Sequence, residues 1–157
     1  MKQTPPKPPT GLSKFFFRMP ITLYRLGLGW MLGNRFLLIH HVGRKSGAIR
    51  QAVVEVVRHD TTTDTYVVCS GFGEGSQWFQ NLMKTPDVTI QVGRRKLDVH
   101  AERLATAAGG DEMVDYAHRH PKAARELAQF MGFKVDGSDA EYRAVGEHLP
   151  FVAFRPH

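Results

Sequence analysis

The chain has 157 residues and a mass of 17.7 kDa, a length that fits one compact domain and leaves little room for two separate cores. Hydrophobic residues make up 42% and charged residues 23%, which excludes a mostly disordered chain. The single cysteine, Cys69, excludes an intrachain disulfide and a multi-cysteine metal site. The net charge of +6 favours an anionic partner, such as a phosphate-bearing cofactor, nucleic acid or acidic lipid.

The first 32 residues divide into a polar and an aromatic part. Residues 1–10 are rich in proline and predict a flexible tail ahead of a single domain over residues 11–157. The largely apolar segment from Leu12 to Leu32 is interrupted by three basic residues, which excludes a membrane-spanning helix. We expect an aromatic helix docked on the domain. The alternative is that Phe15 to Trp30 lies in a membrane interface.

The middle of the chain predicts antiparallel strands. FLLIHHV and AIRQAVVEVVRH flank a loop with a glycine at each end, Gly43 and Gly47, and this pattern predicts a hairpin. The tract DTTTDT (residues 60–65) predicts an exposed turn, and TYVVCS predicts a short buried strand.

A second hairpin follows from strict alternation of apolar and polar residues in VTIQV and LDVHA. Folding the chain at Arg94-Arg95 places apolar side chains opposite each other on one face. The expected pairs are Val92 with Leu97, Ile90 with Val99, and Val88 with Ala101.

Helical patterns surround these strands. Ser76 is placed to cap a brief helix, QWFQNLMK. Asp111 is placed to cap a longer helix. Pro121 is placed to begin the next helix, which Gly132 ends. A further helix starts after Asp139, and the last strand, LPFVAF, follows it. Sequential hairpins with helices at both ends predict a mainly β fold, a small antiparallel barrel with helices packed outside it.

The loop Gly43-Arg44-Lys45-Ser46-Gly47 places two cations, a hydroxyl and flexible backbone amides at one hairpin tip, and Arg50 follows on the strand. Arginine offers a planar fork and lysine a point charge, so the cluster suits a phosphate. The order G-x-x-x-x-G-K-[ST] is missing, and a strand follows the loop where a nucleotide-binding loop requires a helix. The alternative is a solvated basic turn.

A second glycine-rich loop, Ser70-Gly71-Phe72-Gly73-Glu74-Gly75-Ser76, precedes the brief helix. Its glycines let a flat ligand approach the backbone, and the helix start beyond them offers free amides to an anion. Trp78 and Asn81 lie within one turn on that helix, where an aromatic face and an amide can flank a common pocket. The alternative for Trp78 is core packing.

The eight histidines carry no metal-ligand spacing, and we expect no metal site. His40 and His41 are adjacent and point to opposite faces of a strand. Nucleic-acid binding is disfavoured because the densest run of phenylalanines, Phe15 to Phe17, lies near the N-terminus, where it does not interleave with basic residues on strand faces.

Several blocks, in this order and spacing, resemble one family. They are LLIHHVGRKSGAIRQAVVEVV, VVCSGFG, QWFQNLMKTPDVTIQVGRRKLDVHAERL and LPFVAFRP. The chain resembles the deazaflavin-dependent nitroreductase family, a branch of the split β-barrel flavin-binding superfamily, from about Phe15 to Pro156. The most specific parts are the Gly43–Gly47 loop with Arg50, and the Trp78 to Val92 block.

The resemblance implies a split barrel that binds the 8-hydroxy-5-deazaflavin coenzyme F420, whose phospholactyl-oligoglutamate tail is anionic. It also implies hydride transfer between the reduced ring and an electron-poor small molecule, an enone or a nitro-type acceptor. By position, Arg44, Lys45, Ser46 and Arg50 would hold the phosphate and tail. The residues implied around the ring are Val53 and Val54 along it, Ser70, Gly71, Phe72, Gly73 and Ser76 on its other side, and Trp78 beside it.

Two departures from the family pattern bear on function. The second loop is short, with Gln77 before Trp78, and this leaves FMN open as an alternative cofactor. Tyr142 is the one tyrosine placed like those of nitro-reducing relatives, and it is the candidate proton donor, with water as the other source. The alternative for Tyr142 is a partly buried helix tyrosine. A non-catalytic carrier of cofactor or lipid at the membrane surface is the further alternative. We expect a cytoplasmic protein, by the absence of disulfides, and a homodimer, by analogy with split-barrel relatives.

Overall fold

A computed structural model describes residues 35–157 of the chain. The predicted tail over residues 1–10 and the aromatic helix that follows it lie outside the described residues.

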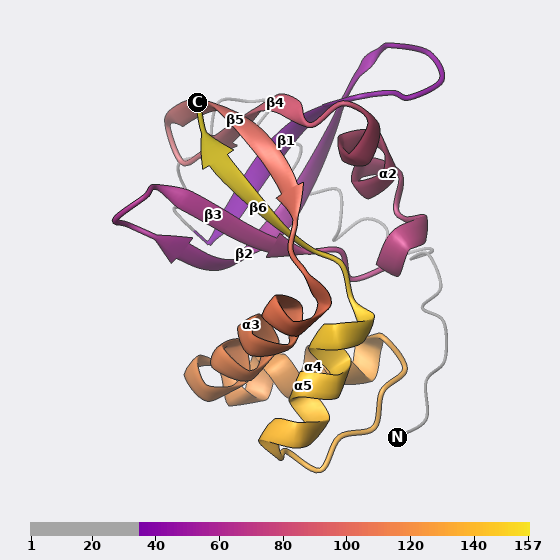
Figure 1. The fold of residues 1–157 in the computed structure, drawn as a ribbon, viewed down its shortest axis with the longest axis vertical. Helices are drawn as coiled ribbons and strands as arrows, with labels where there is room; N and C mark the ends of the chain where they lie inside the picture. Colours follow the sequence, from indigo (N-terminus) through magenta and orange to yellow (C-terminus); the bar gives the residue numbers. More distant parts are fainter. Residues whose placement is uncertain (1–34) are drawn as a thin grey trace.

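Six antiparallel strands close into a barrel in the order β1-β2-β3-β6-β5-β4 (Figure 1). This confirms the predicted fold class, a split-barrel-like antiparallel β-barrel with helices outside it. The strands are β1 (Phe36–Val42), β2 (Ile49–Asp60), β3 (Thr65–Cys69), β4 (Asp87–Val92), β5 (Arg95–Arg103) and β6 (Phe151–Pro156). The helices are the short 3-10 turn η2 (Gly73–Gly75), α2 (Gln77–Lys84), α3 (Thr106–Arg119), α4 (Pro121–Phe130) and α5 (Asp139–His148).

The first hairpin forms as predicted, with β1 paired to β2 from Phe36 opposite Glu55 to Val42 opposite Ile49. The register predicted for the second hairpin is wrong by two residues, since Ile90 faces Leu97 where Val99 was expected. The cause is Gly93, whose φ of 59° permits a tighter two-residue turn. Because side chains alternate with a period of two, this shift keeps the same residues facing inward.

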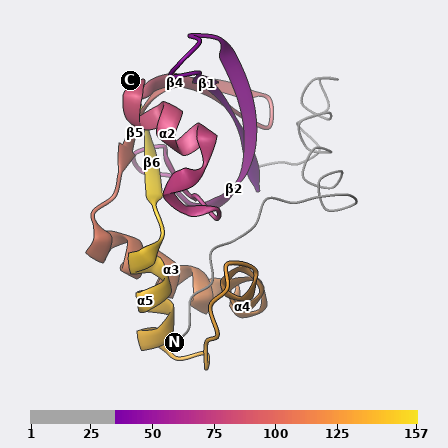
Figure 2. The same cartoon turned by 90° about the vertical axis from the view of Figure 1, so that its right-hand side faces the viewer.

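Apolar side chains fill the barrel, and α2 lies across one of its ends (Figure 2). Phe79 and Leu82 of α2 are almost fully buried and pack against interior residues such as Ile39 and Ile90. Their spacing of three residues places both on one helix face. Ser76 occupies the N-cap position of α2 as predicted, but its side chain makes no capping hydrogen bond. The barrel interior therefore fixes the position of α2.

The other helices form a layer beside the barrel (Figure 1), where α3 and α5 pack most closely. The predicted start of α3 at Asp111 is wrong, because the helix begins at Thr106 and includes two glycines that favour a later start. The glycines let α3 and α5 approach each other closely. A Cβ on Gly109 would lie 2.9 Å from the carbonyl oxygen of Gly146, and one on Gly146 would lie 2.6 Å from Met113 Cβ.

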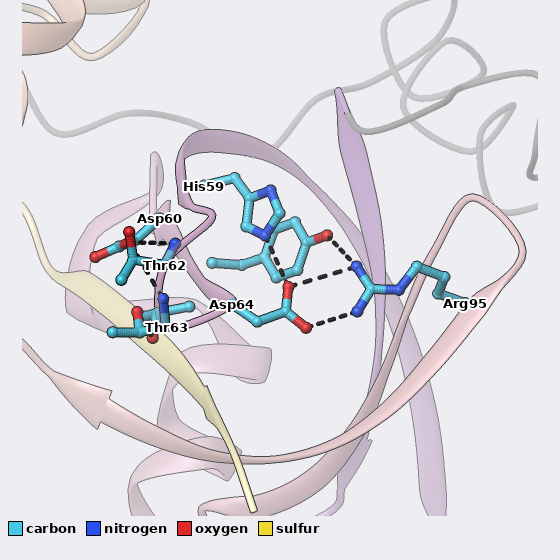
Figure 3. Close-up of polar contacts among 8 residues, drawn as sticks. His59, Asp60, Thr62, Thr63, Asp64 and Arg95 are labelled. Atoms are coloured by element: carbon cyan, nitrogen blue, oxygen red, sulfur yellow. Dashed lines mark hydrogen bonds and ion pairs between the residues drawn. The ribbon is translucent and has the colours of Figure 1, made fainter.

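At the end of the barrel away from α2, four side chains join the β2–β3 turn to the β4–β5 hairpin (Figure 3). Arg95 donates to Asp64 at 2.6 Å and to the Tyr66 hydroxyl at 3.3 Å. His59 Nε2 lies 2.8 Å from the Asp64 carboxylate, and its ring stacks on Tyr66 at 4.0 Å. Hydrogen bonds from Arg95 and then His59 hold the pKa of Asp64 below its usual range.

We expect Gly146→Ala to destabilise the fold by about 1–3 kcal/mol, because the added methyl group would collide with backbone of α3 that cannot move alone. Urea unfolding measures the change. The matched control is Gly75→Ala, since a Cβ there meets nothing within 4 Å. Equal free energies of unfolding for the two variants would contradict this packing account.

Asp64→Asn removes the charge at this cluster but keeps a side chain that tolerates the φ of 56° at this position. Because folding lowers the pKa of Asp64, its ion pair stabilises the fold above the ordinary carboxyl pKa. That stabilisation is lost as the pH falls from about 4 through the lowered value. At neutral pH we expect the variant to be less stable by about 1 kcal/mol or less, because the pair is half-exposed. Unfolding measured against pH should show the gap closing in acid, and a constant gap would refute the assignment.

Candidate functional site

A cavity of about 850 Å³ lies between the β1–β2 loop and α2. It unites five of the predicted binding residues, which are Arg44, Lys45, Ser46, Arg50 and Trp78. The remaining lining residues are His41, Gly43, Ile49, Gln51, Ala52, Gln77 and Asn81.

The β1–β2 loop, residues 43–47, turns tightly between two glycines, and the conformation of Gly47 is one that favours glycine. Gly43 and Gly47 are joined by a backbone hydrogen bond of 2.8 Å. A Cβ on Gly43 would lie 2.7 Å from the Ser46 hydroxyl oxygen, and Gly47 has a φ of 74°. The loop thus turns within five residues and presents the side chains of Arg44, Lys45 and Ser46 at its tip.

Arg44 is held by α2 through both its backbone and its side chain. Its backbone N–H donates to Asn81 Oδ1 at 3.1 Å, and its Nη1 donates to the same oxygen at 2.9 Å and to Gln77 Oε1 at 2.8 Å. Lys84 Nζ donates to the Arg44 carbonyl oxygen at 2.8 Å. Since α2 is anchored in the barrel, the direction of the Arg44 guanidinium is set before any ligand arrives.

Beneath Arg44, Asn81 and His41 are both nearly fully buried. Asn81 Nδ2 lies 2.9 Å from His41 Nδ1, a contact between residues 40 positions apart in the chain. Burial, and then the positive charge of Arg50, lowers the pKa of His41. Both effects favour the neutral imidazole.

Lys45 and Arg50 are exposed, and within residues 35–157 neither forms a hydrogen bond or an ion pair. An exposed cation that has no partner among residues 35–157 keeps its donors available to a ligand with respect to that part of the chain. Two such cations beside the oriented Arg44 make the cavity chemically suited to a phosphate or a carboxylate.

Trp78 contributes an apolar wall. It is half-buried, packs against the barrel interior and meets Phe79 edge to face at 6.4 Å between ring centroids. The ring accordingly serves core packing and lines the cavity at the same time.

The second glycine-rich loop does not line this cavity. Ser70 is fully buried and donates from its hydroxyl to the Gly73 carbonyl oxygen at 2.6 Å, while Phe72 meets Phe130 of α4 at 5.5 Å. Gly71 and Ser76 are also absent from the lining, as are Val53 and Val54 of β2. The resemblance implies that Lys45 and Gly73 contact the same cofactor molecule, but the two do not line a common cavity. A cofactor contact for Val53, Val54 and the five residues of the second loop stays a prediction.

Tyr142 also lies elsewhere. It is 4% exposed, belongs to the core between the helices and lines a separate cavity of about 320 Å³ with His118 and Arg125. The structure does not bring it together with the β1–β2 loop.

Sequence reasoning missed two residues that line the cavity, Gln77 and His41, and a third, Lys84, that holds the β1–β2 loop. Gln77 was noted only as a departure from the family, His41 was treated as an ordinary histidine, and Lys84 was not considered. Each acts through a contact between segments 33 or more residues apart, which local patterns do not reveal.

Other chemistry is limited in the described part of the chain. Burial raises the pKa of the Cys69 thiol to about 12, so it is a poor nucleophile. Over residues 35–157 no three His, Cys, Asp or Glu side chains gather as a metal site. In the same range, every helix is too short or too polar to cross a membrane.

Comparison with known proteins gives one curated relative, from Mycobacterium tuberculosis, that carries the provisional name F420H(2)-dependent quinone reductase Rv3178. The two are 35% identical over 79 residues, which is 49% of this chain. The match spans 65% of that relative, less than two thirds of its length.

Two solved structures share the fold. One is described as an F420-H2 dependent reductase (19% identity, TM-score 0.54), and the match covers 79% of this chain and 96% of that one. The other is described as an FMN binding protein related to pyridoxamine 5'-phosphate oxidase, from Nostoc punctiforme (11% identity, TM-score 0.53). That match covers 94% of this chain and 83% of that one. At these identities the likeness shows the fold alone.

A family model for F420H(2)-dependent quinone reductases matches residues 21–129, which is well over half of the 157 residues. This agrees with the deazaflavin-dependent family that the sequence blocks resemble. The chain belongs to the F420H(2)-dependent quinone reductase family.

Proposed function

We propose that this protein is an F420H2-dependent oxidoreductase that reduces an electron-poor small molecule, a quinone in the first instance. The observation that carries the proposal is the cavity where α2 holds Arg44 in place beside Lys45 and Arg50, which have no partner within the described residues. Family membership supplies the cofactor class, and the cavity supplies the means to hold its charged end.

The residues present fit an anionic deazaflavin. The cavity volume of about 850 Å³ falls within the usual range for cofactor-sized ligands. Arg44, Lys45 and Arg50 offer charged donors, and Ser46 offers a hydroxyl, to the phosphate or glutamate carboxylates of the tail. Trp78 offers an aromatic edge on the α2 side. When bound, the reduced coenzyme supplies a hydride.

The protein's own contribution is binding and orientation. Holding Arg44 by Asn81 and Gln77 before binding reduces the entropy lost when a ligand is captured. The exposed Lys45 and Arg50 raise the rate at which an anion is attracted to the loop. A charged tail fixed at this point would restrict where the ring can lie along the barrel surface.

The proton that accompanies the hydride has no assigned donor at the β1–β2 loop. Tyr142 is buried among the helices, so its role as proton donor stays a prediction that needs a route to the acceptor. Water at the open cavity is the simpler source. An enone or nitro-type acceptor also stays a prediction, as do a homodimer, a cytoplasmic location and membrane contact by the N-terminal segment.

Replacing both loop cations, in Arg44→Gln/Lys45→Gln, should weaken F420 binding about tenfold or more, since two charge-assisted contacts are lost. Titration of the purified protein with oxidised F420, followed by tryptophan fluorescence, measures the affinity. FMN is titrated in parallel.

The matched control is Lys122→Gln/Lys134→Gln, which removes two exposed positive charges from the helical layer, away from the cavity. It should bind F420 as the wild type does. Unchanged affinity in the loop variant would remove these residues from the site. Tighter binding of FMN than of F420 would replace the proposed cofactor, and saturable binding of neither would refute the function.

A further inference from the structure

The hydrogen bonds around Asn81 determine which way its amide points. Oδ1 faces two groups that can only donate, the backbone N–H and the Nη1 of Arg44, at 3.1 and 2.9 Å. An amide nitrogen in that place would set donors against donors. The oxygen must therefore face Arg44, and the amide nitrogen must face the other way.

That orientation fixes the proton on His41. Asn81 Nδ2 can only donate, so His41 Nδ1, 2.9 Å away, must accept. The ring proton is then on Nε2, and the imidazole is neutral. A proton on Nδ1 would face the Asn81 N–H across the same distance, and turning the amide to relieve that clash would point its NH2 group at Arg44. One proton arrangement satisfies all three residues.

We propose that His41 is a positioning residue for the anion-binding loop, because its Nδ1 locks the Asn81 amide and the amide in turn orients Arg44. His41 lies near the end of β1, under the loop, where it forms part of the cavity wall but is only 4% exposed. Its side-chain hydrogen bond goes to Asn81, so it is assigned a role through that residue. The identity of the anion as the F420 tail rests on the proposed function, whereas the positioning role does not.

The surroundings of His41 favour the neutral ring. The groups that act on it electrostatically are Arg50 on β2 and His40 on β1, and Arg44 lies beyond Asn81. Its polar contacts are the Asn81 amide on α2 and the backbone of Gln51 on β2. No carboxylate among residues 35–157 bonds to this ring.

The proton position is tested directly by the ¹⁵N chemical shifts of His41 in the wild-type protein at pH 7.5. We expect the shifts of an imidazole protonated at Nε2, with Nδ1 accepting a hydrogen bond. Protonation at Nδ1, or a charged ring at this pH, would overturn the proposal.

Two variants test the consequence for anion binding. His41→Asn places an amide oxygen where Nδ1 was and keeps an acceptor for Asn81, whereas His41→Leu removes the acceptor and leaves the Asn81 N–H unsatisfied. Sulfate is the probe, because its charge does not change near neutral pH. Its binding is followed by the amide shifts of the β1–β2 loop.

We expect His41→Leu to bind sulfate about three- to tenfold more weakly than the wild type, and His41→Asn to bind within about twofold of it. Thermal unfolding of both variants separates loss of the fold from loss of positioning. Equal binding by His41→Leu and the wild type would overturn the proposal. So would equal weakness of the two variants, or no saturable sulfate binding by the wild type.

Titration of the same variants with F420 separates this inference from the proposed function. If sulfate responds as expected and the wild type does not bind F420, the function fails and the positioning role stands. If F420 binds and His41→Leu does not weaken it, the cofactor assignment stands and the positioning role fails.

Discussion

The need to satisfy a buried amide is the constraint on which the rest of the site depends. Asn81 is 2% exposed, and a polar group so placed costs about 1–3 kcal/mol if it is left without partners. Its partners are Arg44 and His41, which come from a hairpin about 40 residues away. Folding α2 across the barrel end therefore brings the loop and helix into one arrangement.

The barrel makes this arrangement rigid. Phe79 and Leu82 anchor α2 in the interior, and β1 carries both interior residues and the buried His41. A ligand site supported by packed elements loses less entropy on binding than a free loop does. The exposed cations at the loop tip are thus presented from a framework whose geometry comes from apolar burial.

Much of the fold could be predicted from local pattern. The first hairpin, the brief helix after Ser76, and the start of α4 at Pro121 all follow from alternation, capping positions or proline placement. The errors came where tertiary contacts outweigh local preference. Gly93 tightens one turn, and close packing of α3 on α5 keeps two glycines inside a helix.

The part of the site that could be predicted is the part that depends on local composition and spacing. The cations of the Gly43–Gly47 loop and Trp78 stand out by composition and spacing, and the structure places them in one cavity. The hydrogen bonds that orient Arg44 join β1, the loop and α2. No local sequence motif predicts them, because these segments are far apart in the chain. The second glycine-rich loop is a conspicuous local pattern that predicted a binding role. In the structure its Phe72 packs against α4, and none of the loop residues lines the cavity.

The central claim is that the loop is held in its binding form before the ligand arrives. Amide hydrogen exchange across residues 43–47, with and without saturating F420, tests it most directly. We expect the Arg44 amide, which is bonded to Asn81, to be protected in both states, and the amides of Lys45 and Ser46 to gain protection only when F420 is present. If the Arg44 amide exchanges as fast as the amides of Lys45 and Ser46 in the absence of the ligand, the loop is not held in its binding form.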